Sequence, residues 1–155
     1  MEAEPKLLLD KLVEQEEKLS QLYELFAQTF PVDREFWERM ASEERMHASW
    51  IEKLRRAAVE NVVFFSEGKL RLRGVETFLV FIDQCLDKAR AGEVERSRSL
   101  RLAHDLEAAL LEERVFDHFA GDTPKFAEVA EKMRRAIENH RQHLEAKIGT
   151  NRFPG

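Results

Sequence analysis

Four long segments of this chain carry apolar side chains at alternating steps of three and four residues, which is the spacing of one helix face. They cover about residues 5–30, 34–60, 97–120 and 124–149. Glycine and proline, which build the turns of β-rich folds, number only 6 and 4. The pattern therefore predicts an all-α fold of long helices.

The connections between these segments predict how the helices are arranged. Pro31 ends the first helix, and Asp33 is a candidate N-cap for the second. Residues 61–92 form a long crossover, with a shorter amphipathic helix over about residues 74–91. Short turns make neighbouring helices antiparallel, whereas a long crossover returns the chain to the opposite end. We expect one domain over residues 1–155, with the connectivity of a ferritin-like four-helix bundle and a fifth helix in its crossover.

Composition and charge exclude several classes of function. A net charge of -5 gives the chain no overall attraction to nucleic acid or to an anionic membrane. No apolar run approaches the roughly 20 residues that cross a bilayer, and the acidic N-terminus lacks the features of a signal peptide. We therefore expect a cytoplasmic protein. Cys85 is the single cysteine, so no internal disulfide or cysteine-bound metal is expected.

Five ionisable residues occupy positions on the apolar helix faces: Glu16, Glu44, His47, Glu107 and His140. Any one of them alone is explained by an edge position or by a satisfied hydrogen bond. Three buried carboxylates without compensation would cost several kcal/mol each. One bound cation would compensate all of them, so the set predicts a metal site.

The spacing of these residues predicts that they share one level of the bundle. Glu44 and His47 are three residues apart, so both side chains leave the same face of their helix. Glu16 lies about as far before the Pro31 turn as this pair lies after it. Glu107 and His140 are similarly placed about the turn near residues 121–124. Both hairpins thus carry their polar residues near mid-bundle.

Carboxylate oxygens and imidazole nitrogens suit iron or manganese, and also zinc. With three carboxylates and two histidines, iron is our first choice, as one or two ions. No catalytic residue is assigned. Tyr23 lies two turns from Glu16 and is either a hydrogen-bond or electron donor to the site or a core residue with a satisfied hydroxyl.

These residues resemble the rubrerythrin branch of the ferritin-like superfamily over nearly the whole chain. The segment Glu16-x6-Tyr23-x2-Phe26-Ala27 resembles the first ligand helix of that family, and Glu44-Arg45-Met46-His47 resembles its Glu-x-x-His motif. Leu106-Glu107 resembles the third-helix carboxylate, and His140 matches the histidine of the fourth helix. The resemblance implies oxidation of ferrous iron or reduction of peroxide or dioxygen, with an external electron donor because no rubredoxin-like cysteine site is present.

The chain also departs from the family pattern. Ile137 stands where the family has a second bridging glutamate, and Leu110 stands where some members have another glutamate. Glu138 points about 100° away from Ile137 on an ideal helix, and Glu113 would contribute only if its helix were rotated. The site would then hold two metals less tightly, hold one, or be vestigial.

Three functions follow from this pattern. The first is a non-haem iron oxidoreductase of peroxidase or ferroxidase type. The second is metal sequestration without turnover. The third is a helical interaction module with a degenerate metal site, which the Ile137 departure favours.

The crossover is more apolar than one thin helical layer needs. Val62-Val63-Phe64-Phe65 and the segment 78–81 would be covered either within the chain or by a second copy in a homodimer.

Overall fold

The computed structural model describes residues 3–60, 63–64, 68–113, 120–121 and 124–152. In these residues the chain forms five helices: α1 (Ala3–Thr29), α2 (Arg34–Glu60), α3 (Gly68–Arg90), α4 (Arg96–Glu113) and α5 (Pro124–Arg152). A short 3-10 turn, η1 (Pro31–Asp33), joins α1 to α2. The predicted all-α class is confirmed.

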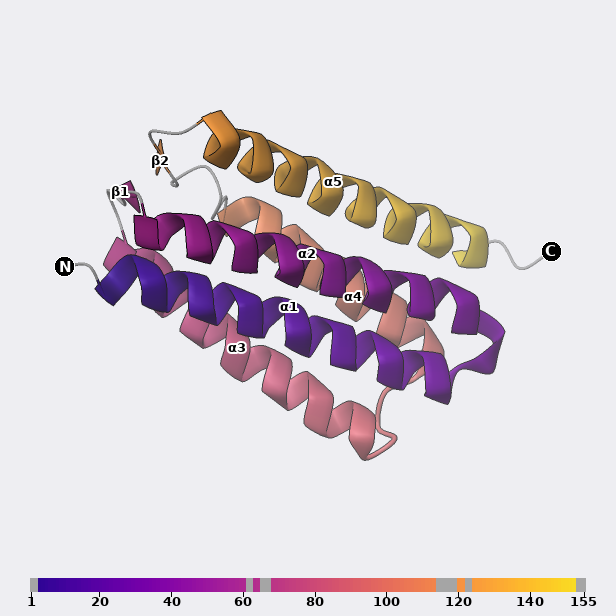
Figure 1. The fold of residues 1–155 in the computed structure, drawn as a ribbon. Coiled ribbons are helices and arrows are strands. Elements are labelled where there is room, and N and C mark those ends of the chain that lie inside the picture. The colour runs from indigo at the N-terminus through magenta and orange to yellow at the C-terminus, as the bar shows by residue number, and fades with distance from the viewer. Residues whose placement is uncertain (1–2, 61–62, 65–67, 114–119, 122–123, 153–155) are drawn as a thin grey trace.

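The long helices lie side by side, and α1 lies between α2 and α3 (Figure 1). Helix α1 packs against both of these neighbours, α4 packs against α5, and α2 packs against α5. The α1–α2 and α4–α5 pairs are the two hairpins that the sequence pattern predicts, and the α2–α5 contact joins them.

A single hydrophobic cluster holds the helices together. It contains buried residues from all five helices, including Leu22, Trp37, Ile82, Leu100 and Leu144. The stacked rings of Tyr23 and Trp37 have centroids 5.4 Å apart. Full burial of one large apolar side chain stabilises the folded state by roughly 2 kcal/mol. The buried apolar faces of the five helices therefore contribute strongly to the stability of this packing.

The turn between α1 and α2 is anchored by a buried carboxylate. The backbone N–H of Asp33 donates to the Phe30 carbonyl at 2.9 Å, which closes the turn at Pro31. Both side-chain oxygens of Asp33 accept hydrogen bonds from Arg96, at 2.7 and 2.9 Å. Lys147 lies 3.1 Å from the same carboxylate. Asp33 thus ties η1 to the start of α4 and to the last part of α5.

Two predicted helix boundaries, each of which falls at a glycine, were wrong. Helix α3 begins at Gly68, before the predicted start at Gly74. Helix α5 continues past Gly149 to Arg152. A glycine in a helix interior costs only about 1 kcal/mol relative to alanine, which neighbouring helix formers offset.

The predicted end of the third helix at residue 120 was also wrong. Ala120 and Gly121 form the short strand β2, antiparallel to β1 (Val63–Phe64), with Val63 opposite Gly121. This pairing provides hydrogen-bond partners for backbone groups in an extended conformation. Gly121 lies in the pair, and glycine has a low helix propensity. Two residues named in the sequence analysis, Val62 and Phe65, lie outside the described residues, and the side chains of four more lie outside them: Val63, Phe64, Leu110 and Glu113.

The described helices include none that combines the length and the apolar character needed to cross a membrane.

Candidate metal centre

All five predicted ligand positions meet in the interior of the structure. Glu16 comes from α1, Glu44 and His47 from α2, Glu107 from α4 and His140 from α5. Each of these residues is almost fully enclosed, with at most 2% of its surface exposed. The four helices that the sequence assigned to the bundle thus each contribute to one buried polar cluster.

The cluster consists of two groups with a shared member. Glu16, Glu44 and His47 form one group, and Glu44, Glu107 and His140 form the other. In each group, one candidate ligand atom from every residue lies within 4.8 Å of the others. Glu44 belongs to both, so its carboxylate lies between two potential ion positions.

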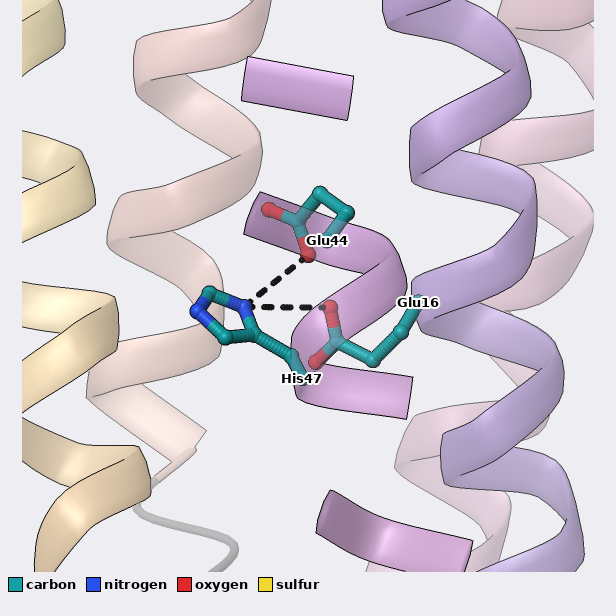
Figure 2. A group of neighbouring side chains, drawn as sticks. All are labelled: Glu16, Glu44 and His47. Carbon is teal, nitrogen blue, oxygen red and sulfur yellow. Dashed lines mark hydrogen bonds and ion pairs between the residues drawn. The ribbon is translucent and has the colours of Figure 1, made fainter. Parts of the chain in front are cut away.

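The first group is built on the i, i+3 spacing within α2. Figure 2 shows the Glu44 and His47 side chains converging with Glu16 from the neighbouring helix α1. Nδ1 of His47 lies 3.3 Å from Oε2 of Glu44 and 3.9 Å from Oε2 of Glu16. One imidazole nitrogen and two carboxylates therefore face a common point.

The second group joins the two hairpins. Nε2 of His140 lies 2.7 Å from Oε1 of Glu44 and 3.0 Å from Oε1 of Glu107. The hydroxyl of Tyr23 donates a hydrogen bond to Oε1 of Glu107 at 2.9 Å. Tyr23 is therefore a buried residue whose hydroxyl is satisfied by the cluster itself. The rings of His47 and His140 have centroids 5.6 Å apart, which places the two groups side by side.

Several polar atoms of the cluster lack a hydrogen-bond partner among the described residues. They are both carboxylate oxygens of Glu16 and Oε2 of Glu107, together with Oε1 of Glu44 and Nε2 of His140, which lie 2.7 Å apart as an ion pair without hydrogen-bond geometry. Buried polar atoms are usually paired, and each unpaired one costs on the order of 1–3 kcal/mol. A cation coordinated by these atoms would satisfy them together, so the donor set fits a metal.

Burial and mutual repulsion shift the protonation of this cluster. Burial and then the nearby Glu44 raise the pKa of Glu16 well above its usual value, and the same causes raise the pKa of Glu107 to about 8. Burial opposes ionisation of Glu44 as well, but the charge of His140 and hydrogen bonds to the carboxylate lower its pKa. Without a cation, protons therefore compensate much of the negative charge.

His140 is the basic side chain that faces Glu44 and Glu107. Burial acts to lower its pKa, but Glu107 and Glu44 outweigh burial and raise it. Burial, followed by Glu107, also raises the pKa of the Tyr23 phenol well above its usual value. Among the described residues no lysine or arginine forms an ion pair with Glu16, Glu44 or Glu107.

Ile137 and its neighbour Glu138 face different directions on α5, as ideal helix geometry predicts. Ile137 is 2% exposed and precedes His140 by one turn. Glu138 is half-buried and pairs with Arg141 at 2.7 Å, so it does not replace the missing carboxylate. His143 lies near Glu43 and Arg39, in neither group. Position 137, where the resemblance to rubrerythrins places a second bridging glutamate, is therefore apolar and buried.

Comparison with protein-family models, curated proteins and solved structures gave no match. The assignment of this centre consequently depends on the geometry and chemistry of the chain's own residues.

Within the part of the chain that the structure describes, Glu43 is a contact of the cluster that the sequence pattern missed. Its Oε2 accepts a hydrogen bond from Nδ1 of His140 at 2.6 Å, although the two residues are 97 positions apart. Glu43 lies off the apolar face of α2, and its only signal in the sequence is its position beside Glu44.

Proposed function

We propose that this chain is a non-haem metal protein, with iron as the preferred ion, held by Glu16, Glu44, His47, Glu107 and His140. The observation that carries the proposal is the pair of buried groups that share Glu44. Each group offers two carboxylates and one imidazole. Such mixed oxygen and nitrogen ligands suit iron and manganese, and zinc is a further alternative.

We propose further that the fold is a ferritin-like four-helix bundle of the rubrerythrin type. Helices α1, α2, α4 and α5 would be the bundle, and α3 would be the crossover. Support comes from the cluster, to which each of the four bundle helices contributes, whereas no described side chain of α3 belongs to it. The packing of α3 on α1, outside the α1–α2 pair, agrees with this role.

The two groups favour two ions per chain. Glu44 would then bridge them, Glu16 and His47 would complete one position, and Glu107 and His140 the other. Three carboxylates would compensate most of the charge of two divalent ions. The remaining coordination positions would be open to small ligands, which a redox metal site requires.

We propose that the activity is oxidation of ferrous iron or reduction of peroxide. Bound iron would supply the electrons that peroxide or dioxygen accepts. The chain's part is to hold the ions, to exclude bulk water through complete burial, and to place the Tyr23 hydroxyl 2.9 Å from Glu107. Cys85 is the sole cysteine in the sequence, so the chain cannot form a cysteine-bound iron site as an internal electron donor. Electrons would therefore come from an external donor.

Metal sequestration without turnover is the second candidate, because Ile137 is buried where a second bridging carboxylate is expected. A single bridge would hold the two ions less tightly. A helical interaction module with a degenerate site is the extreme form of this alternative.

An exposed apolar pair on α3 supports a homodimer as a further proposal. Val80 is 58% exposed and Phe81 is 44% exposed.

Metal analysis of protein purified without chelator tests the proposal. We expect about one or two iron, manganese or zinc ions per chain, or uptake of ferrous iron under anaerobic conditions. Glu44→Ala and His47→Ala should each lower occupancy sharply, whereas Glu17→Ala, which removes an exposed carboxylate next to Glu16, should not. Absence of metal together with no ferrous uptake would overturn both metal functions. Peroxide consumption by the ferrous-loaded protein separates the enzyme from the store.

A further inference from the structure

The imidazole of His140 is held from both sides. Nε2 faces Glu44 and Glu107, at 2.7 and 3.0 Å. On the opposite side of the ring, Nδ1 lies 2.6 Å from Oε2 of Glu43. An imidazole that binds a metal through one nitrogen keeps its proton on the other, and an acceptor at that second nitrogen fixes both the tautomer and the ring plane.

Glu43 is itself held in place. Nε of Arg39 donates to its Oε1 at 3.1 Å, one helical turn away on α2. The Glu43 side chain is 22% exposed, so it is partly enclosed, whereas Arg39 is 65% exposed. Each carboxylate oxygen therefore has its own partner, and the oxygen that faces His140 is oriented by the contact of the other with Arg39.

Two adjacent residues of α2 thus act on the same ring. Glu44 points into the cluster and meets Nε2, while Glu43 lies at the margin of the cluster and meets Nδ1. Consecutive helix positions differ by about 100° in direction, which allows the pair to meet opposite sides of an imidazole from α5. Within the described residues no such carboxylate meets the far nitrogen of His47.

We propose that Glu43 is a positioning residue for the metal centre: it accepts a hydrogen bond from Nδ1–H of His140 and so presents Nε2 to the metal shared with Glu44 and Glu107. This inference rests on the proposed function, because it requires a metal at that group. It predicts that the two halves of the centre differ, since the His140 half is braced by a second carboxylate and the His47 half is not.

Titration with Co²⁺ alone, followed by visible absorption and competition with a chelator, tests the role. Removing the partner of a metal-binding histidine costs about 10- to 100-fold in metal affinity, and we expect Glu43→Ala to do so. Glu43→Gln keeps an acceptor oxygen and should lose less. Glu38→Ala, an exposed glutamate of the same helix, is the matched control and should bind like wild type.

A double-mutant cycle distinguishes positioning from general destabilisation. If Glu43 acts through His140, Glu43→Ala should have almost no further effect on Co²⁺ affinity in a His140→Ala background. Nitrogen NMR of Zn²⁺-loaded protein gives a second readout. His140 should carry its proton on Nδ1 in wild type, and this proton should exchange faster in Glu43→Ala, while circular dichroism shows both proteins folded.

The outcomes are distinguishable. Wild type that binds neither Co²⁺ nor Zn²⁺ overturns this inference, and the proposed function falls with it when ferrous iron is not taken up either. Wild type that binds while Glu43→Ala binds equally tightly overturns this inference alone. An affinity loss that persists unchanged without His140 also overturns it, because Glu43 would then act by another route.

Discussion

Oε1 of Glu44 lies 2.7 Å from Nε2 of His140, so a glutamate of the first hairpin meets a histidine of the second at the centre of the molecule. The other oxygen of the same carboxylate lies 3.3 Å from Nδ1 of His47. Glu44 is therefore the residue on which both halves of the candidate centre depend.

The shared position of Glu44 predicts unequal effects of removing single carboxylates. Glu16→Ala removes a proposed ligand from the His47 half only, and Glu107→Ala removes one from the His140 half only. We expect each variant to retain about half of the wild-type metal, and Glu44→Ala to retain almost none, because a lost ligand acts only on the ions it touches. Metal analysis after dialysis measures this. Equal retention by all three variants would show that the two groups do not bind separately.

Ile137 offers a test by gain of function. Ile137→Glu places a carboxylate one turn before His140, on the same face of α5. The metal-free variant should lose on the order of 3 kcal/mol of folding free energy, because a further buried carboxylate lacks compensation. Added metal should recover much of this loss and bind more tightly than in wild type. Thermal unfolding with and without Zn²⁺ gives both values.

Ile137→Gln is the control for that substitution, since it is polar and similar in size but carries no charge. It should be destabilised in both conditions and gain no metal affinity. If Zn²⁺ stabilises Ile137→Glu no more than it stabilises wild type, residue 137 does not face the ions.

The cluster was predictable from sequence because helix geometry fixes both direction and level. A step of three or four residues keeps Glu44 and His47 on one face, and similar distances from a turn bring Glu16 to the same level. In the structure these residues meet because they lie on regular helices that pack side by side. Their metal remains a proposal, since donor atoms restrict the ion without naming it.

Other features escaped the sequence because they depend on contacts between distant segments. Glu43 meets His140 from a position off the apolar face, and nothing in the local pattern of α2 marks it. The pairing of Val63 with Gly121 is likewise a long-range contact. Helix ends placed at a single glycine were wrong because tertiary packing outweighs a local cost of about 1 kcal/mol.

Tyr23→Phe should separate the contribution of the hydroxyl from the contribution of the ring. The ring packs on Trp37 and is kept, while the hydrogen bond to Glu107 is lost. We expect a loss of about 1 kcal/mol in unfolding free energy and weaker metal binding at the His140 half. Ser20→Ala, which removes another buried hydroxyl of α1, should leave metal affinity unchanged, because Ser20 donates to the Glu17 carbonyl. Urea unfolding and Co²⁺ titration check both expectations; identical metal affinity in Tyr23→Phe would show that its hydroxyl serves the fold alone.

Asp33→Asn should destabilise the end of the molecule where η1, α4 and α5 meet. Asp33 is 1% exposed and receives two hydrogen bonds from Arg96. Hydrogen bonds to a charged group are worth more than neutral ones, so we expect a loss of roughly 2 kcal/mol in unfolding free energy at neutral pH. Asp87→Asn, at a side chain that is 80% exposed, is the control and should change stability little.

The same carboxylate predicts how this loss depends on pH. The Arg96 hydrogen bonds, helped by Lys147, lower the pKa of Asp33 in the folded protein against the opposing effect of burial. A lowered folded pKa means that the unfolded chain binds the proton more readily, so the stabilisation is complete above the unfolded pKa of about 3.9 and declines as pH falls below it. The difference in unfolding free energy between wild type and Asp33→Asn should therefore be constant from neutral pH to about pH 5 and shrink below about pH 4. Urea unfolding of both proteins across this range measures it, and a difference that grows on acidification would contradict the ion-pair assignment.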